Sequence, residues 1–384
     1  MVSVLRQFAG ILMPIAHGSG SSFGHLQRDL AAVAGSLLTL QNPLARNVMR
    51  SGLELMLDSA GVLQEVTTED GGPIWREFQN KVQAFYAFEH VDSILGTGSD
   101  HSFSLPDLLS RVALLDPWCA VWAVEGLGHG YTGRKSYQTR PAGLFKNSEV
   151  HLPAWSIVPL HTGMGLALAQ SILSGADDCK VGADRFLESC QRNSQEDCWE
   201  AAYEALGLVV FNLYPHWLLP LHHYLSQQQE LLSYFWHGVG RAIYFTPLNL
   251  PPWRSAPWAG LVMCMSETPT ALARRNALAG FSWAMTLVNI RHPQILGLFL
   301  RHHAAGLAAP DAFINGVYSS AVVWQHSIPR ADANLEALCH YQPGPSDGFL
   351  PGVWENLIGQ PCKQALNDCQ ALLSLKHVAG LFRL

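Results

Sequence analysis

A short pattern of small residues recurs six times between residues 125 and 320, and no other feature constrains the fold of this chain as strongly. Each copy is centred on one anchor residue, and the six anchors are Gly126, Gly163, Ala205, Gly238, Gly280 and Gly316. Successive anchors are 37, 42, 33, 42 and 36 residues apart, which is the usual period of helical-hairpin repeats. The pattern therefore predicts an all-α fold that contains about six repeats of about 38 residues.

The small residues are expected to pack helices together. The anchor and the residue four positions later lie one turn apart on one helix face, and in the six copies eleven of these twelve residues are Gly, Ala or Ser. A second small position follows two residues after the anchor, at Gly128, Gly165, Gly207, Gly240 and Ser282, with Tyr318 in the last copy. Because glycine inside a helix costs about 1 kcal/mol relative to alanine, its repeated use predicts close packing on more than one side of each helix.

A phosphate-binding loop is the alternative interpretation of the paired glycines. Such a loop follows a strand and opens a helix, and none of the six copies follows a convincing strand. The packing interpretation is therefore preferred.

Composition favours a large buried core. Apolar residues make up 48% of the chain and charged residues only 14%, which argues against intrinsic disorder. The net charge of −6 is not accompanied by a basic patch, so a nucleic-acid partner is not expected. The twelve tryptophans are scattered along the chain, as expected for the cores of successive hairpins.

The cysteines and the hydropathy pattern predict a cytoplasmic protein. The eight cysteines form no CxxC pair and show no zinc-ligand spacing, which favours reduced, buried thiols. No run reaches the 18 to 20 apolar residues that span a bilayer, so no transmembrane segment is expected. The stretch Phe8–Ala16 faintly resembles a signal peptide, but Pro14 interrupts it and no clean cleavage site follows.

The chain divides into three regions. Residues 1–85 form an N-terminal helical segment, in which 26–40 and 44–63 have helical periodicity. Residues 86–330 contain the repeats, and 331–384 form a capping segment that ends in a helix near Cys362–Phe382. A helix is also expected over Ile74–Leu95, and another begins at Ser104, a candidate N-cap residue with Pro106 in the first turn. The three regions are expected to form one structural unit.

The motifs, taken in order, resemble those of an uncharacterised bacterial family that is encoded in enediyne polyketide biosynthetic clusters. The resemblance begins at Leu5-Arg6 and Ser19–Phe23 and includes the segments VEGLGHGY (Val124–Tyr131), HTGMGLALA (His161–Ala169), HGVGRAIYF (His237–Phe245), AGFSWAM (Ala279–Met285) and FINGVYSSA (Phe313–Ala321). Around Glu204 the chain reads EALGLVVF, where the family has a Gly-aromatic-Gly segment. The resemblance implies a role in natural-product biosynthesis. It supplies no catalytic residues, because the family's reaction is not established.

Candidate catalytic residues come from the positions that flank each anchor. The residue before the anchor and the residue three after it are four apart, so equivalent helices would present these side chains on one surface. The polar residues at these positions that we expect to carry chemistry are Glu125, His129, Glu204, His237 and Arg241. A Glu–His pair can act as acid and base or offer metal ligands, and Arg241 can hold an anionic group. The alternative is that these are polar residues on the solvated edge of packed helices, or satisfied core histidines.

Four further residues are expected to contact a bound molecule: His161, Trp236, Trp283 and Asn315. No metal site is expected, because the 17 histidines show neither HExxH nor a His/His/carboxylate spacing. The sequence identifies no cofactor.

Two functions fit these observations. The first is an accessory protein or enzyme of natural-product biosynthesis that binds a hydrophobic small molecule in the concavity of a helical-repeat array. The second is a non-catalytic scaffold that binds a partner protein on the same surface. The array itself is expected to be an open solenoid, with a closed toroid as the alternative.

Overall fold

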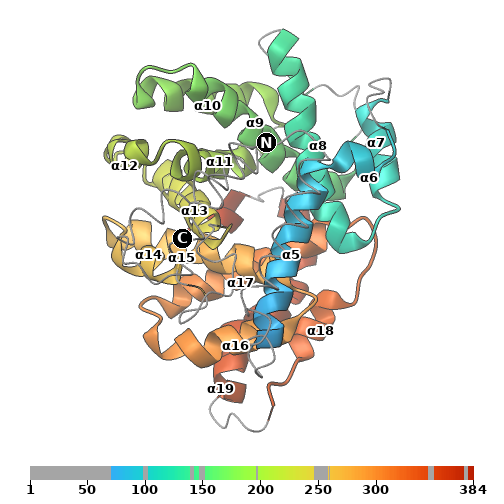
Figure 1. The fold of residues 1–384 in the computed structure, drawn as a ribbon, viewed down its shortest axis with the longest axis vertical. Coiled ribbons are helices and arrows are strands. Elements are labelled where there is room, and N and C mark those ends of the chain that lie inside the picture. Colours follow the sequence, from blue (N-terminus) through green and yellow to red (C-terminus); the bar gives the residue numbers. More distant parts are fainter. Residues whose placement is uncertain are drawn as a thin grey trace, which may run out of the picture.

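A computed structural model describes residues 71–97, 103–138, 142–146, 152–195, 198–245, 258, 260–344, 350–375 and 379–384. Every regular element in these ranges is a helix, which confirms the all-α class (Figure 1). The expected helices at 26–40 and 44–63, and the apolar stretch at Phe8–Ala16, lie outside the described residues.

The elements follow one another as a series of short and medium-length helices. The α-helices are α5 (Gly71–Glu89), α6 (Val91–Ile94), α7 (Leu105–Val112), α8 (Pro117–Gln138), α9 (Ile157–Ser174), α10 (Cys179–Asn193), α11 (Trp199–Leu213), α12 (Leu218–Leu225), α13 (Gln229–Phe245), α14 (Gly260–Ser266), α15 (Ala271–Asn289), α16 (Pro293–His303), α17 (Pro310–Ser327), α18 (Asn334–His340), α19 (Leu350–Trp354) and α20 (Gln360–Leu375). Shorter turns are the 3-10 helices η1 (Ala154–Ser156), η2 (Pro215–Trp217), η4 (Ala304–Gly306) and η6 (Ala379–Phe382), and the π-helical turn η5 (Glu355–Gly359).

Each copy of the small-residue pattern lies in one helix, and consecutive copies pack against each other. The six helices are α8, α9, α11, α13, α15 and α17, and each contacts the next. A Cβ atom placed on the anchor Gly163 of α9 would lie 1.9 Å from the backbone oxygen of Glu125 in α8. The same holds for Gly238 against Glu204, and for Gly280 against His237. In each case the anchor glycine contacts the preceding small-residue helix, at the residue directly before the anchor of that helix.

The second small position makes the reciprocal contact with the helix that follows. A Cβ atom on Gly128 would lie 2.3 Å from the oxygen of Leu160, and one on Gly240 would lie 1.8 Å from the oxygen of Ala277. In α15 this position is Ser282, whose hydroxyl instead lies 3.1 Å from the oxygen of Phe313 in α17. These distances leave no room for a methyl group, so the packing interpretation of the glycines is confirmed.

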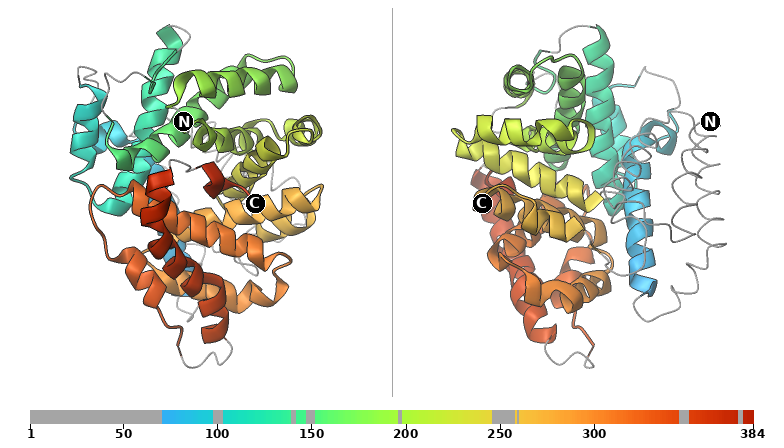
Figure 2. Two further views of the ribbon diagram at one scale, coloured as in Figure 1. Left: turned by 180° about the vertical axis from the view of Figure 1, so that it is seen from behind. Right: turned by 60° about the vertical axis from the view of Figure 1, so that its left-hand side comes forward.

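The remaining helices fill the spaces around these six. Helices α10, α12, α14 and α16 alternate with them along the chain, and each contacts a small-residue helix that is its neighbour in sequence. Helix α5 lies against α8, α15 and α16, and α20 packs on α17. Figure 2 shows α5 along one side of the molecule and α20 on another.

The ends of three helices can be compared with the sequence predictions. Ser104 accepts a hydrogen bond from the Asp107 amide and its own amide donates to the Asp107 carboxylate, which forms a capping box at α7 as expected. The helix expected over Ile74–Leu95 is divided into α5 and α6 at His90. The final helix ends at Leu375, and residues 379–384 form a separate segment.

The 379–384 segment lies in the middle of the fold. Its helical turn η6 contacts α11, α13 and α17, and it is the short red helix near the centre of the left view in Figure 2. Leu381 and Phe382 are buried there. This position brings the segment against the polar side chains described next.

One helical stretch among the described residues is apolar and long enough to cross a membrane. It runs over Ala154–Ser174, and 78% of its most apolar window is buried inside the fold. A core helix has the same properties, so this stretch agrees with the expected absence of a transmembrane segment.

Candidate acid–base site

Four of the five predicted catalytic residues meet in the interior. Glu125 comes from α8, Glu204 from α11, and His237 and Arg241 from α13. The spacing of four places His237 and Arg241 one turn apart on the same face of α13. The glycine contacts draw α8 to α9, α9 to α11 and α11 to α13, so side chains from three helices can reach one another. We call these four residues the acid–base cluster.

Arg241 joins the two carboxylates of the acid–base cluster. Its Nη2 donates to Oε1 of Glu125 at 2.5 Å, and its Nη1 donates to Oε2 of Glu204 at 3.3 Å. The other oxygen of Glu204 lies 3.0 Å from Nδ1 of His237. The four side chains are between 0% and 5% exposed. The solvated-edge interpretation of these residues is therefore wrong, because the packing of α8, α11 and α13 excludes water from them.

Aromatic rings cover the acid–base cluster. Trp283, which was expected to contact a bound molecule, lies under the guanidinium of Arg241, with 5.1 Å between Cζ and the ring centroid. The rings of Trp283 and Phe382 also pack against the imidazole of His237, at centroid distances of 6.1 and 5.5 Å. A charged arginine over an indole ring is stabilised by a cation–π interaction that grows as water is excluded.

The two carboxylates have opposite pKa shifts. Burial raises the pKa of Glu125, and the attraction of Arg241 only partly offsets it. Burial acts on Glu204 in the same direction, but Arg241 and His237 together outweigh it and lower the pKa of Glu204. The difference arises because Glu204 has two hydrogen-bonding partners, whereas Glu125 has one and is also repelled by Glu204. Glu125 is therefore the carboxylate that more readily holds a proton.

Counting charges shows that the acid–base cluster holds one exchangeable proton when it is neutral. Two carboxylates oppose the single fixed positive charge of Arg241. An uncompensated charge is very costly in a buried site, so neutrality requires one more proton, on His237 or on Glu125.

Three polar atoms at the acid–base cluster are buried and have no hydrogen-bond partner in the structure: His237 Nε2, Arg241 Nε and Trp283 Nε1. When neutral His237 donates through Nδ1 to Glu204, Nε2 carries the lone pair. A carboxylate that fixes the imidazole in this way is how a histidine is prepared to act as a general base. The arrangement can therefore take a proton at His237 Nε2 and return it there.

His129 does not join the acid–base cluster, although it lies one turn from Glu125 on α8. Its Nε2 lies 2.9 Å from Oε1 of Gln170 on α9. Its ring packs against that of Phe88, with 5.3 Å between the ring centroids. His129 is half-buried and lies closer to the molecular surface than the four residues of the cluster. Burial lowers the pKa of His129, which favours the neutral imidazole.

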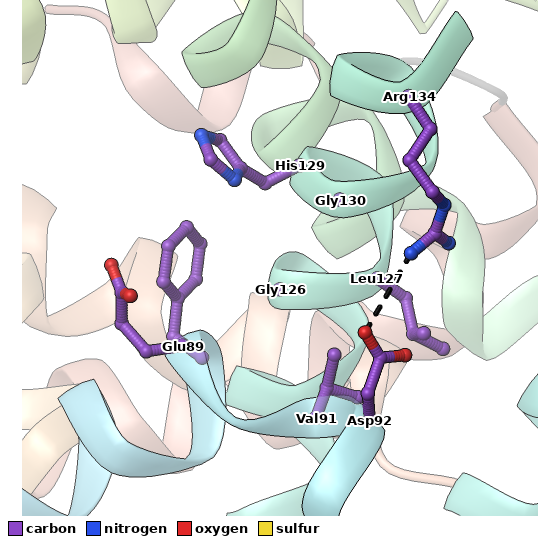
Figure 3. Close-up of a pocket in the computed structure, with 9 residues that line it drawn as sticks. Glu89, Val91, Asp92, Gly126, Leu127, His129, Gly130 and Arg134 are labelled. Atoms are coloured by element: carbon purple, nitrogen blue, oxygen red, sulfur yellow. Dashed lines mark ion pairs between the residues drawn. The ribbon is translucent and has the colours of Figure 1, made fainter. Parts of the chain in front are cut away.

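His129 lines a small surface pocket of about 80 Å³ instead. Figure 3 shows Arg134 pointing towards Asp92 across this pocket, with Gly126 and Gly130 at its wall, and the two charged groups are 3.6 Å apart. Asp92 and Arg134 are both partly exposed. In this pocket the charges of Asp92 and Arg134 therefore offset each other, and the pocket is open to solvent.

The other three residues expected to contact a bound molecule form no hydrogen bond with the acid–base cluster. His161 is fully buried, with Nδ1 2.7 Å from the oxygen of Ile157 and Nε2 accepting from the Gln195 amide at 3.1 Å. The indole Nε1 of buried Trp236 donates to Nδ1 of His222 at 3.0 Å. Asn315 on α17 is half-buried, and its Oδ1 has no hydrogen-bond partner in the structure.

Sequence reasoning missed a second buried polar network, which we call the Lys81 network. The fully buried Lys81 pairs with Glu77 at 3.4 Å, and Glu77 accepts a 2.6 Å hydrogen bond from the hydroxyl of Tyr244. The Nδ2 atom of Asn289 donates to Tyr244 at 3.0 Å, and Asn80 donates to Oδ1 of Asn289 at 3.0 Å. Two local signals mark residues of the network, although neither specifies the contact between α5 and α13. Glu77 and Lys81 are four apart on α5, and Tyr244 follows His237 and Arg241 at helical spacing on α13.

Comparison of the chain with protein-family models, with curated proteins and with solved structures finds no match. Within the described residues, no group of three or more His, Cys, Asp or Glu side chains is placed to hold a metal ion. The function must therefore be argued from the acid–base cluster itself.

Proposed function

We propose that this protein binds an apolar small molecule and moves a proton to or from it at His237. The observation that carries this proposal is the state of the His237 imidazole. Glu204 holds its Nδ1 at 3.0 Å, while its Nε2 is buried and has no partner. A buried polar atom without a partner is destabilising. Such a destabilising arrangement persists in active sites, where the atom takes part in binding or catalysis.

Each member of the acid–base cluster has a distinct role in this proposal. His237 is the proton carrier, and Glu204 is a positioning residue that sets its tautomer and balances its charge. Arg241 holds the two carboxylates in place. Glu125, whose pKa is raised by burial, is the second place where the proton can reside. Trp283 and the other rings supply an apolar surface, which selects an apolar substrate.

The proposal includes a ring-like arrangement of the six small-residue helices around the acid–base cluster. It is supported by the contacts of each such helix with the next, and by a further contact between α17 and α9 that brings two non-consecutive members of the row together. The resemblance to the enediyne-cluster family supports a place in natural-product biosynthesis, where apolar, conjugated substrates are common.

The alternative function is a non-catalytic scaffold for a partner protein. One surface feature favours it: Leu213 and Leu219 are large apolar side chains that are about half exposed at the turn between α11 and α12. Exposed apolar patches often mark protein interfaces. This surface does not involve the acid–base cluster, so the two functions can be tested separately.

The decisive experiment is native mass spectrometry of the purified full chain, followed by analysis of the small molecules that denaturation releases. We expect a stoichiometric apolar ligand that is lost in His237→Gln, because this substitution removes the imidazole whose free Nε2 would contact the ligand. The matched control is His161→Gln, which changes a buried histidine whose two ring nitrogens are both bonded to backbone. Equal retention of the ligand by both variants would contradict the proposal, and recovery of the chain only with a partner protein would favour the scaffold.

A further inference from the structure

The ring of Phe382 closes the acid–base cluster on one side. Its centroid lies 5.5 Å from that of His237 and 5.8 Å from that of Trp283, and the residue is 1% exposed. These are two of the residues whose ring nitrogens are buried without a partner. An apolar ring thus stands against the atoms that the proposed function assigns to proton transfer and ligand contact.

The two rings that pack on His237 are held in very different ways. Trp283 belongs to α15, whose backbone touches that of α13 at Gly280, so it cannot move without separating two tightly packed helices. Phe382 belongs to the four-residue turn η6, which is not part of any long helix. Of the two rings, that of Phe382 is therefore the one that can move away from His237.

Among the described residues, two polar contacts hold the 379–384 segment in place. Arg383 forms an ion pair with Glu230, whose side chain is mostly exposed, and the Leu384 amide donates to Oδ1 of Asn276 at 3.0 Å. Exposed ion pairs contribute little to stability because water competes for both charges. The segment is retained mainly by the burial of Leu381 and Phe382, which a ligand of similar shape could replace.

We propose that Phe382 occupies the subsite for a planar, apolar group of the ligand, and that the 379–384 segment withdraws when the ligand binds. The inference rests on the proposed function, since it takes His237 as the reacting group. It also narrows the substrate class to an aromatic or conjugated molecule with a hydrogen-bonding group that reaches Nε2 of His237. The resident Phe382 keeps the acid–base cluster dry until such a molecule arrives.

Indole is a suitable probe because it has a planar apolar ring and one hydrogen-bond donor. The full chain, labelled with ¹⁵N-histidine, is titrated with indole and followed by NMR. We expect Phe382→Ala to lower the dissociation constant for indole by about tenfold, because the competing ring is gone, and indole to shift the His237 ring nitrogens. The control is Phe313→Ala, which removes a fully buried ring that stacks on Phe299, and its dissociation constant for indole should be that of the wild type.

A second variant keeps the test decisive if Phe382→Ala does not fold. Arg383→Ala removes the ion pair with Glu230 and leaves the Phe382 ring in place, and we expect it to tighten indole binding by about twofold to fivefold by lowering the population of the closed segment. Unchanged affinity in every folded variant would overturn the subsite, and so would tighter binding without a shift at His237. Neither result touches the proposed function, which stands or falls on ligand retention by His237→Gln.

Discussion

The acid–base cluster and the Lys81 network share helix α13 and are both buried, but they differ in how completely they are satisfied. In the Lys81 network one ammonium faces one carboxylate, and Tyr244 both donates to Glu77 and accepts from Asn289. In the acid–base cluster two carboxylates share one guanidinium, and three nitrogen atoms lack partners. A balanced and satisfied network fixes a core, whereas an unbalanced one stores a proton and an unused acceptor. This contrast assigns a structural role to the Lys81 network and a chemical role to the acid–base cluster.

Glu77→Gln should be the most destabilising substitution, because it leaves the Lys81 ammonium buried without its counter-charge. Lys81 is fully buried, and desolvation already lowers its pKa despite the attraction of Glu77. Removing one partner of a buried ion pair costs about 3–5 kcal/mol. Urea unfolding followed by circular dichroism would measure the loss. A loss smaller than that of an exposed control, Glu188→Gln, would show that the Lys81 network does not stabilise the core.

His161 should make the fold sensitive to acid, because its two ring nitrogens are used by the backbone. Burial lowers the pKa of His161 from its usual 6.5 to about 4. Between these values the unfolded chain binds a proton that the folded chain does not, so the free energy of unfolding falls as the pH is lowered through this window. The contribution lost is about 3 kcal/mol at 1.4 kcal/mol per pH unit, and it is fully present above pH 6.5.

The measurement is the free energy of unfolding of the wild type and of His161→Gln at several pH values between 7 and 4. The variant should show a shallower decline, while substitution of the exposed His216 should leave the slope unchanged. Parallel curves for His161→Gln and the wild type would mean that His161 is charged in the fold.

Gly280→Ala should destabilise the fold and disturb the acid–base cluster together. Its new methyl group would meet the backbone oxygen of His237 at 1.9 Å, and overpacking of this kind costs about 1–3 kcal/mol. Gly133→Ala is the matched control, because no atom lies within 4 Å of its Cβ position in α8. That control should be neutral or gain up to about 1 kcal/mol from helix propensity. Thermal unfolding would compare them, and equal melting temperatures would contradict the close approach of α13 and α15.

The close approach of helices was predictable from the sequence, and so was much of the acid–base cluster. The recurrence of Gly and Ala around Gly238 and Gly280 indicated where backbones touch, and the residues just before the anchors included Glu125, Glu204 and His237. Those positions lie at the helix contact itself, which is why three of them meet. The sequence pattern is local, however, and it could not show that His129 turns to the surface.

The parts that could not be predicted depend on contacts between distant residues. Glu77 reaches Tyr244 across 167 positions, and Phe382 reaches His237 across 145 positions. No periodicity in α5 or in the 379–384 segment specifies these partners, because any apolar or polar face of suitable size would satisfy the local pattern. His161 shows the same limit, since its hydrogen bond to the Gln195 amide depends on how the chain returns after α10.

Glu125→Gln should destabilise the fold less than Gly280→Ala and far less than Glu77→Gln, although it is the same change as Glu77→Gln in an equally buried place. It removes the carboxylate whose pKa burial raises, and leaves Arg241 paired one-to-one with Glu204. Since the charge is then balanced, we expect the free energy of unfolding to change by less than about 1 kcal/mol. The same urea experiment applies. A loss as large as that of Glu77→Gln would mean that both carboxylates are fully charged and needed, and that the acid–base cluster holds no exchangeable proton.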